Sequence, residues 1–198
     1  MMEKECELDI IARTRGEIMR QHDLTGENLF LIWGYPTAFF LLVEFAALML
    51  WNEPWCLWFS AGIPLVGVPL MAYFIHKDYN RFHHQTHLGN IAMVMWIFIG
   101  AVIGIGGTAI GYAGLFELCF HAMLGLMIGM GCFMTGAILK YKPMMVCGIV
   151  AAFLSFLPLY LQGDFWMWQL PVTAVIAVIA LIIPGHSFKK HVKHYESV

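Results

Sequence analysis

Charged residues are scarce in this sequence of 198 residues. Asp, Glu, Lys and Arg make up 12% of it, whereas a soluble domain contains about 25%. Hydrophobic residues make up 60%, and the mean hydropathy is +0.72. The net charge is only −2 with a pI near 6.5, which excludes a basic surface of the kind that binds nucleic acid, so we expect no nucleic-acid partner. The composition predicts an integral membrane protein whose main partner is the lipid bilayer.

The motifs of common enzymes are also missing. The sequence contains no H-E-x-x-H, no G-x-S-x-G and no glycine-rich phosphate loop after a strand. Its cysteines stand singly, without a C-x-x-C pair, and are expected to be free thiols: Cys6, Cys56, Cys119, Cys132 and Cys147. We therefore expect neither enzymatic activity nor a cofactor.

Long apolar runs are what the sequence has instead. A helix needs about 20 apolar residues to cross roughly 30 Å of hydrocarbon. Six runs meet this length: 29–50, 55–75, 91–112, 115–139, 143–161 and 165–183. The predicted fold class is all-α, a polytopic membrane protein with six transmembrane helices in one bundle over 29–184. A cytoplasmic amphipathic segment, 1–28, is expected before the bundle and a cytoplasmic tail, 185–198, after it.

The positive charges predict the orientation. All eleven lysines and arginines fall on one side of a six-span arrangement, in the N-terminal segment, two connections and the C-terminal tail. The connections on the other side contain Glu53 and Asp164 and no cation. Because cations of short loops accumulate in the cytoplasm, we expect both termini to be cytoplasmic.

Polar residues gather in the outer halves of the spans. Glu44 and His121 both lie roughly 10 Å below the outer interface, and ionisable groups at such depth usually mark function. An isolated carboxylate there cannot stay ionised, so we expect Glu44 to be protonated or to share a proton with His121. The functional interpretation is an outward-open polar pocket, and the alternative is a set of interhelical hydrogen bonds. The candidate residues are Glu44, Ser60, Thr108, Glu117, His121 and Gln169.

Two groups of residues have metal-binding side chains at helical spacing. His83 with His87, and His191 with His194, are four and three residues apart, which suits chelation on a helix; solvated histidines are the alternative. One face of the fourth span would suit Cu(I), or would simply pack in the core: Cys119, Met123, Met127, Met130 and Met134.

Glycines of the third span recur at intervals of four, three and four, which puts them on one stripe of a helix. The fourth span adds two more. This pattern predicts an antiparallel hairpin of these spans in near backbone contact, through Gly100, Gly104, Gly107, Gly111, Gly125 and Gly129.

Two short motifs carry a family resemblance. The run Gly136-Ala-Ile-Leu-Lys-Tyr-Lys-Pro143, together with Ile182-Ile-Pro-Gly185 followed by Lys189 and Lys190, resembles a family of bacterial six-span membrane proteins with no assigned activity. The resemblance implies the inner membrane of a bacterium as the location. It implies no site residue.

Two functions fit these observations. The first is a small-solute or ion transporter or channel that uses the outer pocket. The second is a membrane adaptor, or a metal or pH sensor, that acts through its cytoplasmic histidines. Transport predicts that Glu44 and His121 face a common hydrated cavity, whereas the second function predicts an occluded bundle with an ordered cytoplasmic surface. A homodimer is compatible with either function.

The predicted orientation can be tested by thiol labelling of single cysteines in a cysteine-free background. We expect an impermeant reagent added to intact cells to label cysteines at Glu53, Ala113 and Asp164. Cysteines at Lys77 and Lys140 should react only after the membrane is opened, because they lie in the cytoplasm. Labelling of Lys140→Cys in intact cells would contradict the orientation.

Overall fold

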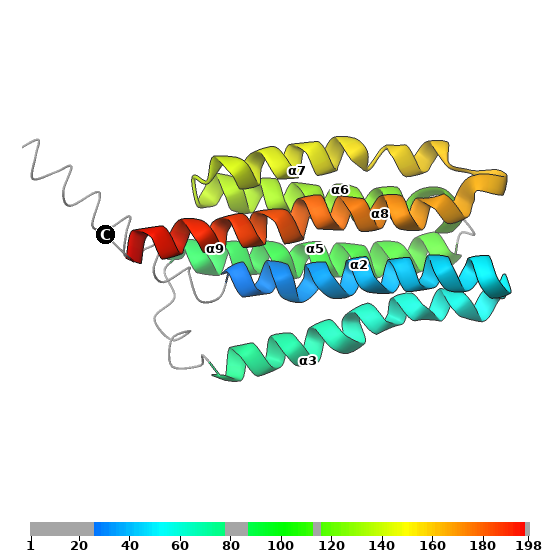
Figure 1. Cartoon of the computed structure of the whole chain (residues 1–198), viewed down its shortest axis with the longest axis horizontal. Coiled ribbons are helices and arrows are strands. Elements are labelled where there is room, and N and C mark those ends of the chain that lie inside the picture. The colour runs from blue at the N-terminus through cyan, green and yellow to red at the C-terminus, as the bar shows by residue number, and fades with distance from the viewer. Residues whose placement is uncertain (1–25, 78–86, 113–115, 197–198) are drawn as a thin grey trace, which may run out of the picture.

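All elements of the described chain are helical. The computed structural model describes residues 26–77, 87–112 and 116–196, and over these ranges the predicted all-α class is confirmed. The α-helices run side by side along the long axis of the molecule (Figure 1). Their bounds are α2 Gly26–Trp51, α3 Gly62–Lys77, α5 His87–Tyr112, α6 Phe116–Ile138, α7 Lys142–Leu154, α8 Gln169–Ala177 and α9 Ile183–Glu196.

Several of these helices are long and apolar enough to cross a bilayer. Five such segments are found in the described residues: Phe30–Trp51, Trp55–Tyr73, Phe120–Ile138, Lys142–Tyr160 and Phe165–Lys190. Large apolar side chains also cover the outside of the bundle, for example Leu65 and Phe153, which are 73% and 72% exposed. A surface of this kind is compatible with contact to lipid tails rather than water.

The two ends of the bundle differ in chemistry. One end, here called the tryptophan end, contains Trp51, Trp55, Trp58, Trp166 and Trp168. The other, here called the lysine end, contains Lys140, Lys142, Lys189 and Lys190. The start of α2, the α6–α7 turn and α9 all lie at the lysine end (Figure 1).

The chain turns at the tryptophan end through 3-10 helices. These are η1 (Pro54–Ala61), η2 (Leu157–Tyr160) and η3 (Gly163–Trp168). η1 starts with Pro54, whose fixed φ and missing N–H are tolerated in a first helical turn. The predicted second and sixth spans therefore begin in 3-10 rather than α-helical geometry.

The last helix extends past the predicted span end at residue 183. α8 passes through one π-helical segment, η4 (Val178–Ile182), and α9 then continues to Glu196. Pro184 lies just after this segment, and a proline inside a helix lacks an N–H and crowds the carbonyl four residues before it. A wider π turn relieves that crowding. Phe188 is 1% exposed, so part of the predicted tail belongs to the helical core.

The closest helix contact joins α6 and α7. A Cβ atom on Gly129 would lie 2.7 Å from the amide nitrogen of Ala152, and one on Gly136 would lie 2.7 Å from that of Met145. A Cβ on Gly148 would collide with the backbone of Phe133. The two backbones therefore touch, as small residues allow in membrane helices.

The predicted pairing of the third and fourth spans through glycine stays a prediction, because only part of its glycine stripe is described. A Cβ on Gly100 of α5 would meet nothing within 4 Å, and one on Gly125 of α6 would meet Ser155 and Ile176. Gly125, Gly129 and Gly136 of α6 thus face α7 and α8, whereas Gly131 faces Trp96 and Ile99 of α5. The surroundings of Gly104, Gly107 and Gly111 lie outside the described part of the structure. α5 does lie beside α6, where the indole N–H of Trp96 donates to Thr135 at 3.0 Å.

A tight turn makes the α6–α7 contact possible. The amide of Tyr141 donates to the carbonyl of Gly136 at 2.9 Å, and the amide of Lys140 donates to that of Ala137 at 3.2 Å. These two bonds form a Schellman motif, which leaves Lys140 in the left-handed region at φ 52°.

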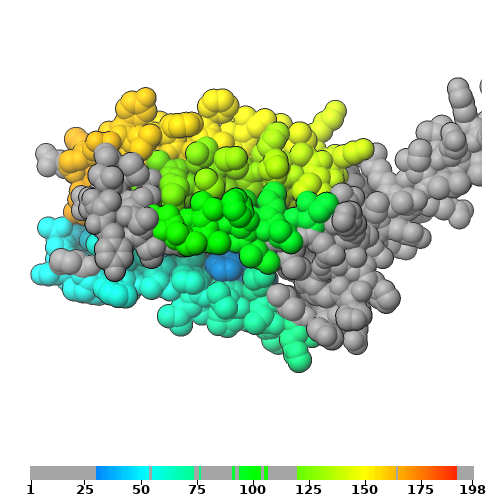
Figure 2. Space-filling model, turned by 180° about the vertical axis from the view of Figure 1, so that it is seen from behind, coloured from blue at the N-terminus to red at the C-terminus, as the bar shows by residue number. Residues whose placement is uncertain are grey.

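α8 and α9 form the second main contact, with α2. A Cβ on Gly34 of α2 would lie 2.9 Å from Cβ of Leu181, and one on Gly185 would lie 3.0 Å from Leu31. Because α8 also packs against α6, it lies between α2 and the α6–α7 pair. α3 lies at the edge of the bundle, and Figure 2 shows α2 emerging between α3 and α5.

The α6–α7 contact can be tested with matched leucine substitutions. We expect Gly148→Leu to lower the free energy of unfolding in detergent by about 3 kcal/mol, because backbone atoms of Phe133 leave the side chain no room. Gly100→Leu is the control and should leave stability unchanged or raised, since its side chain enters open space. Equal losses at the two positions would contradict the helix pairing.

Candidate functional site

Buried polar side chains come from four helices in the half of the bundle nearer the tryptophan end. Three of the predicted pocket residues, Glu44, His121 and Gln169, are among them, and Ser60 is half-buried. The side chains of Thr108 and Glu117 lie outside the described residues. The buried set consists of Glu44 of α2, His121 of α6, Ser155 after α7, and Gln169 and Thr173 of α8.

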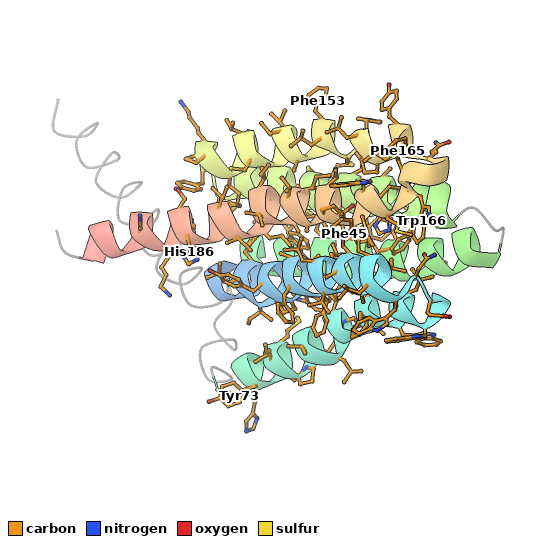
Figure 3. The ribbon with its side chains drawn as sticks, turned by 45° about the vertical axis from the view of Figure 1, so that its right-hand side comes forward. Phe45, Tyr73, Phe153, Phe165, Trp166 and His186 are labelled. Carbon is orange, nitrogen blue, oxygen red and sulfur yellow. The ribbon has the colours of Figure 1, made fainter. Side chains whose placement is uncertain are left out.

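Glu44 lies on the most apolar face of its helix. Leu41 and Leu48 stand three residues before it and four residues after it, and both are buried in a cluster with Leu170 of α8. Residues at these spacings share one helix face, so the carboxyl is directed into the core. Figure 3 shows Phe45 of α2 and Trp166 of η3 in the same part of the bundle.

Ser60 of η1 is the described partner of Glu44. Its hydroxyl and its backbone both lie within hydrogen-bonding reach of the carboxyl. The same hydroxyl donates to the carbonyl of Leu57 at 2.7 Å. The backbone N–H of Ser60 donates to the carboxyl, so Glu44 is an acceptor at this contact.

The second carboxyl oxygen of Glu44 is not satisfied. Oε2 is buried and has no hydrogen-bond partner among the described residues. An unsatisfied buried acceptor costs about 1–3 kcal/mol, and more in the ionised form. Glu44 is therefore a costly residue at this position.

The other polar residues use their hydrogen bonds locally. Thr173 donates to the carbonyl of Gln169 at 2.7 Å, and Ser155 donates to that of Ala152 at 2.6 Å. The Gln169 amide donates to the carbonyl of Leu161 at 2.6 Å and so fastens the turn before η3. Bonds of this kind satisfy a buried polar side chain within its own segment. They support the structural interpretation for these three residues.

The two central residues of the site are buried in the described structure, whereas the pocket interpretation expects them to face an outward-open cavity. Glu44 is 3% exposed and His121 is 6% exposed. The difference arises because Leu41, Leu48 and Leu170 close over the α2 side of the site. α2 and α6 approach α8 from two flanks, and the pairing of Glu44 with His121 stays a prediction.

The predicted metal sites fall mostly outside the described side chains. This applies to His83, His87, His191 and His194, and to Cys119. Among the residues that the structure describes, no three His, Cys, Asp or Glu side chains form a group that could hold a metal ion. Of the proposed methionine face, Met130 and Met134 are about half exposed and point to the periphery.

Sequence reasoning missed the polar contacts at the lysine end. The Tyr35 hydroxyl is hydrogen-bonded to Nε2 of His186 at 2.7 Å, and the Tyr141 hydroxyl to Oγ of Ser187 at 2.6 Å. Both pairs join α9 to a distant segment. Their residues are ordinary interfacial tyrosines in the sequence, and no local pattern identifies the partners.

Comparison of this chain with family models, with curated proteins and with solved structures finds no match. The resemblance carried by the two short motifs stays a prediction. Functional arguments for this chain therefore rest on its own residues.

The cost of burying Glu44 can be tested by measuring the free energy of unfolding. We expect Glu44→Leu to raise the free energy of unfolding by about 1 kcal/mol, because it removes a buried oxygen that lacks a partner. The matched change Gln169→Leu should lower it, because the bond to Leu161 is lost. Equal destabilisation by both changes in a detergent unfolding assay would contradict the cost assigned to Glu44.

Proposed function

We propose that this chain is a small-solute or ion transporter or channel, and that Glu44 is its proton- or ligand-binding group. In this proposal the chain spans the inner membrane of a bacterium six times, with the lysine end and both termini in the cytoplasm. It acts without a cofactor and without enzymatic chemistry. The distribution of lysine and arginine supports the orientation.

The observation that carries the proposal is the buried Oε2 of Glu44, which has no hydrogen-bond partner among the residues that the structure describes. A bundle that only needed to pack would be more stable with a leucine at this position, as buried polar groups without partners are costly. Ionisable residues inside membranes pair with one another, face a cavity or mark a substrate path. A carboxyl oxygen held in the core without a partner is therefore best explained by a ligand or proton that it binds in another state.

The chemistry of Glu44 suggests how such a cycle works. The neutral carboxyl fits the occluded state, because it carries no charge into the apolar core. The ionised carboxylate needs water or a cation beside it, so loss of the proton favours an open state. Protonation of Glu44 would then release the ligand and close the bundle. Such coupling requires the ligand to bind the open and the occluded state with different affinities.

A second function is favoured by a different observation. The bundle is closed around Glu44, and the lysine end is ordered by the bonds of Tyr35 to His186 and of Tyr141 to Ser187. An adaptor or a metal or pH sensor that binds a partner at the cytoplasmic surface has both features. This alternative predicts no flux through the bundle. A homodimer fits either function, and the open face of α5 around Gly100 has space for a second copy.

The two functions can be separated in proteoliposomes loaded with a pH-sensitive dye. We expect the wild type to dissipate an imposed pH gradient faster than empty vesicles, and Glu44→Gln to reduce the rate to that of empty vesicles, since an amide cannot release a proton. Glu53→Gln is the control, because Glu53 is exposed in the turn before η1, and it should match the wild type.

Infrared spectra measure the protonation of Glu44 directly, whatever solute the chain carries. A protonated carboxyl has its own C=O stretch, and raising the pH should remove a band that Glu44→Gln lacks. Equal proton flux in the wild type and in Glu44→Gln would contradict the transport role of Glu44. A wild type that never exceeds empty vesicles, and whose Glu44 band does not respond to pH, would favour the adaptor.

A further inference from the structure

Tyr141 fastens the α6–α7 turn to α9. Its hydroxyl is hydrogen-bonded to Oγ of Ser187 at 2.6 Å, and its ring meets that of Phe188 edge-on, with centroids 5.6 Å apart. Tyr141 is 8% exposed and Phe188 1%, so the joint is part of the packed core. Two segments that are far apart in the sequence are therefore held together at the lysine end.

Four lysines are close in sequence to the residues of this joint. Lys140 and Lys142 flank Tyr141 in the turn, and Lys189 and Lys190 follow Phe188 in α9. Three of the four are exposed, and Lys189 is half-buried. Lys190 is only about 4.5 Å further along the helix axis than Ser187, so its ammonium group can reach the same space as those of the turn.

Neither lysine of the turn is placed where local structure favours it. Lys140 has a φ of 52°, a conformation that usually selects glycine after a helix. Lys142 is the first residue of α7, where the helix dipole disfavours a positive charge. The acidic side chains that the structure describes, Glu44 and Glu53, lie towards the other end. Positive charge thus accumulates here against local preference.

A stripe of exposed apolar side chains continues from Lys142 along α7. Val146, Ile149 and Phe153 follow Lys142 at helical spacing, which places them on its face of the helix. All three are exposed, Phe153 at 72%, and Figure 3 shows Phe153 on the outside of the bundle. The surface therefore combines cations at the interface with apolar side chains at membrane depth.

We propose that this surface binds an anionic phospholipid. The phosphate lies among Lys140, Lys142, Lys189 and Lys190, and an acyl chain lies along the stripe of α7. Lysine binds phosphate as a point charge, and basic clusters beside transmembrane helices bind anionic headgroups. A free phosphate would use only the lysines, whereas the stripe of α7 matches a ligand with a hydrocarbon chain. The proposal does not depend on transport.

The experiment measures thermal stability of the purified chain in neutral detergent during titration with phosphatidylglycerol. Phosphatidylcholine and inorganic phosphate serve as separate probes. We expect phosphatidylglycerol to raise the unfolding temperature in a saturable manner, and the other two probes to have little effect. Loss of each lysine should weaken the apparent affinity about fivefold, as in Lys142→Gln and Lys190→Gln. Lys77→Gln at the end of α3 is the control for net charge and should bind like the wild type.

Lys140→Gly distinguishes lipid binding from a structural role. Glycine relieves the left-handed backbone, so this variant should be at least as stable as the wild type without lipid, yet respond more weakly to phosphatidylglycerol. The proposal is overturned if Lys77→Gln weakens binding as much as Lys142→Gln does. It is also overturned if phosphatidylcholine stabilises equally, or if inorganic phosphate reproduces the whole effect.

Discussion

Hydrocarbon offers the peptide backbone no hydrogen-bond partner, and the architecture of this chain depends on that constraint. Each apolar segment satisfies its backbone internally as a helix. Lipid tails are as apolar as leucine, so helices do not associate by excluding them and need close van der Waals contact instead. Gly129, Gly136 and Gly148 supply such contact between α6 and α7, and Gly34 and Gly185 supply it between α2 and the last helix.

These two contacts organise the remaining elements. α8 lies between them and contacts both α2 and α6. Its own polar residues, Gln169 and Thr173, are fully buried, and each donates to a nearby carbonyl. α3 lies at the edge of the bundle and does not pack between two other helices. Its Gly67 leaves room for the ring of Trp33 of α2 to pack against it.

Glu44 differs from these well-packed and hydrogen-bonded residues. It occupies a face otherwise made of leucine and alanine, and one carboxyl oxygen has no partner among the described residues. The proposed transport role and the proposed lipid site concern opposite ends of the bundle. In these proposals, the half of the bundle near the tryptophan end opens and closes around Glu44. The contact of Tyr141 with α9 holds the helices together at the lysine end during that change.

The amino-acid sequence by itself determined the all-helical class and five segments long enough to cross a bilayer; the described part of the other predicted span, 91–112, contains only a shorter apolar segment, Val94–Ile103. Runs of apolar residues predict membrane helices because length and hydropathy are local properties. The same locality explains why Glu44, His121 and Gln169 could be named as buried polar candidates: they interrupt apolar runs.

Only the tertiary structure decided which helices touch. The sequence predicts close contact of α6 with α5 and does not predict such contact with α7, yet the closest backbone approach is between α6 and α7, because a contact depends on both surfaces and on the turn that joins them. Lys140 provides that turn in a conformation that usually requires glycine. The joint of Tyr141 with Ser187, and the continuation of the last helix past Pro184 through a π turn, likewise involve partners or geometry that local sequence does not specify. Local sequence determines that each segment forms an apolar helix, and packing in three dimensions determines which helix lies beside it.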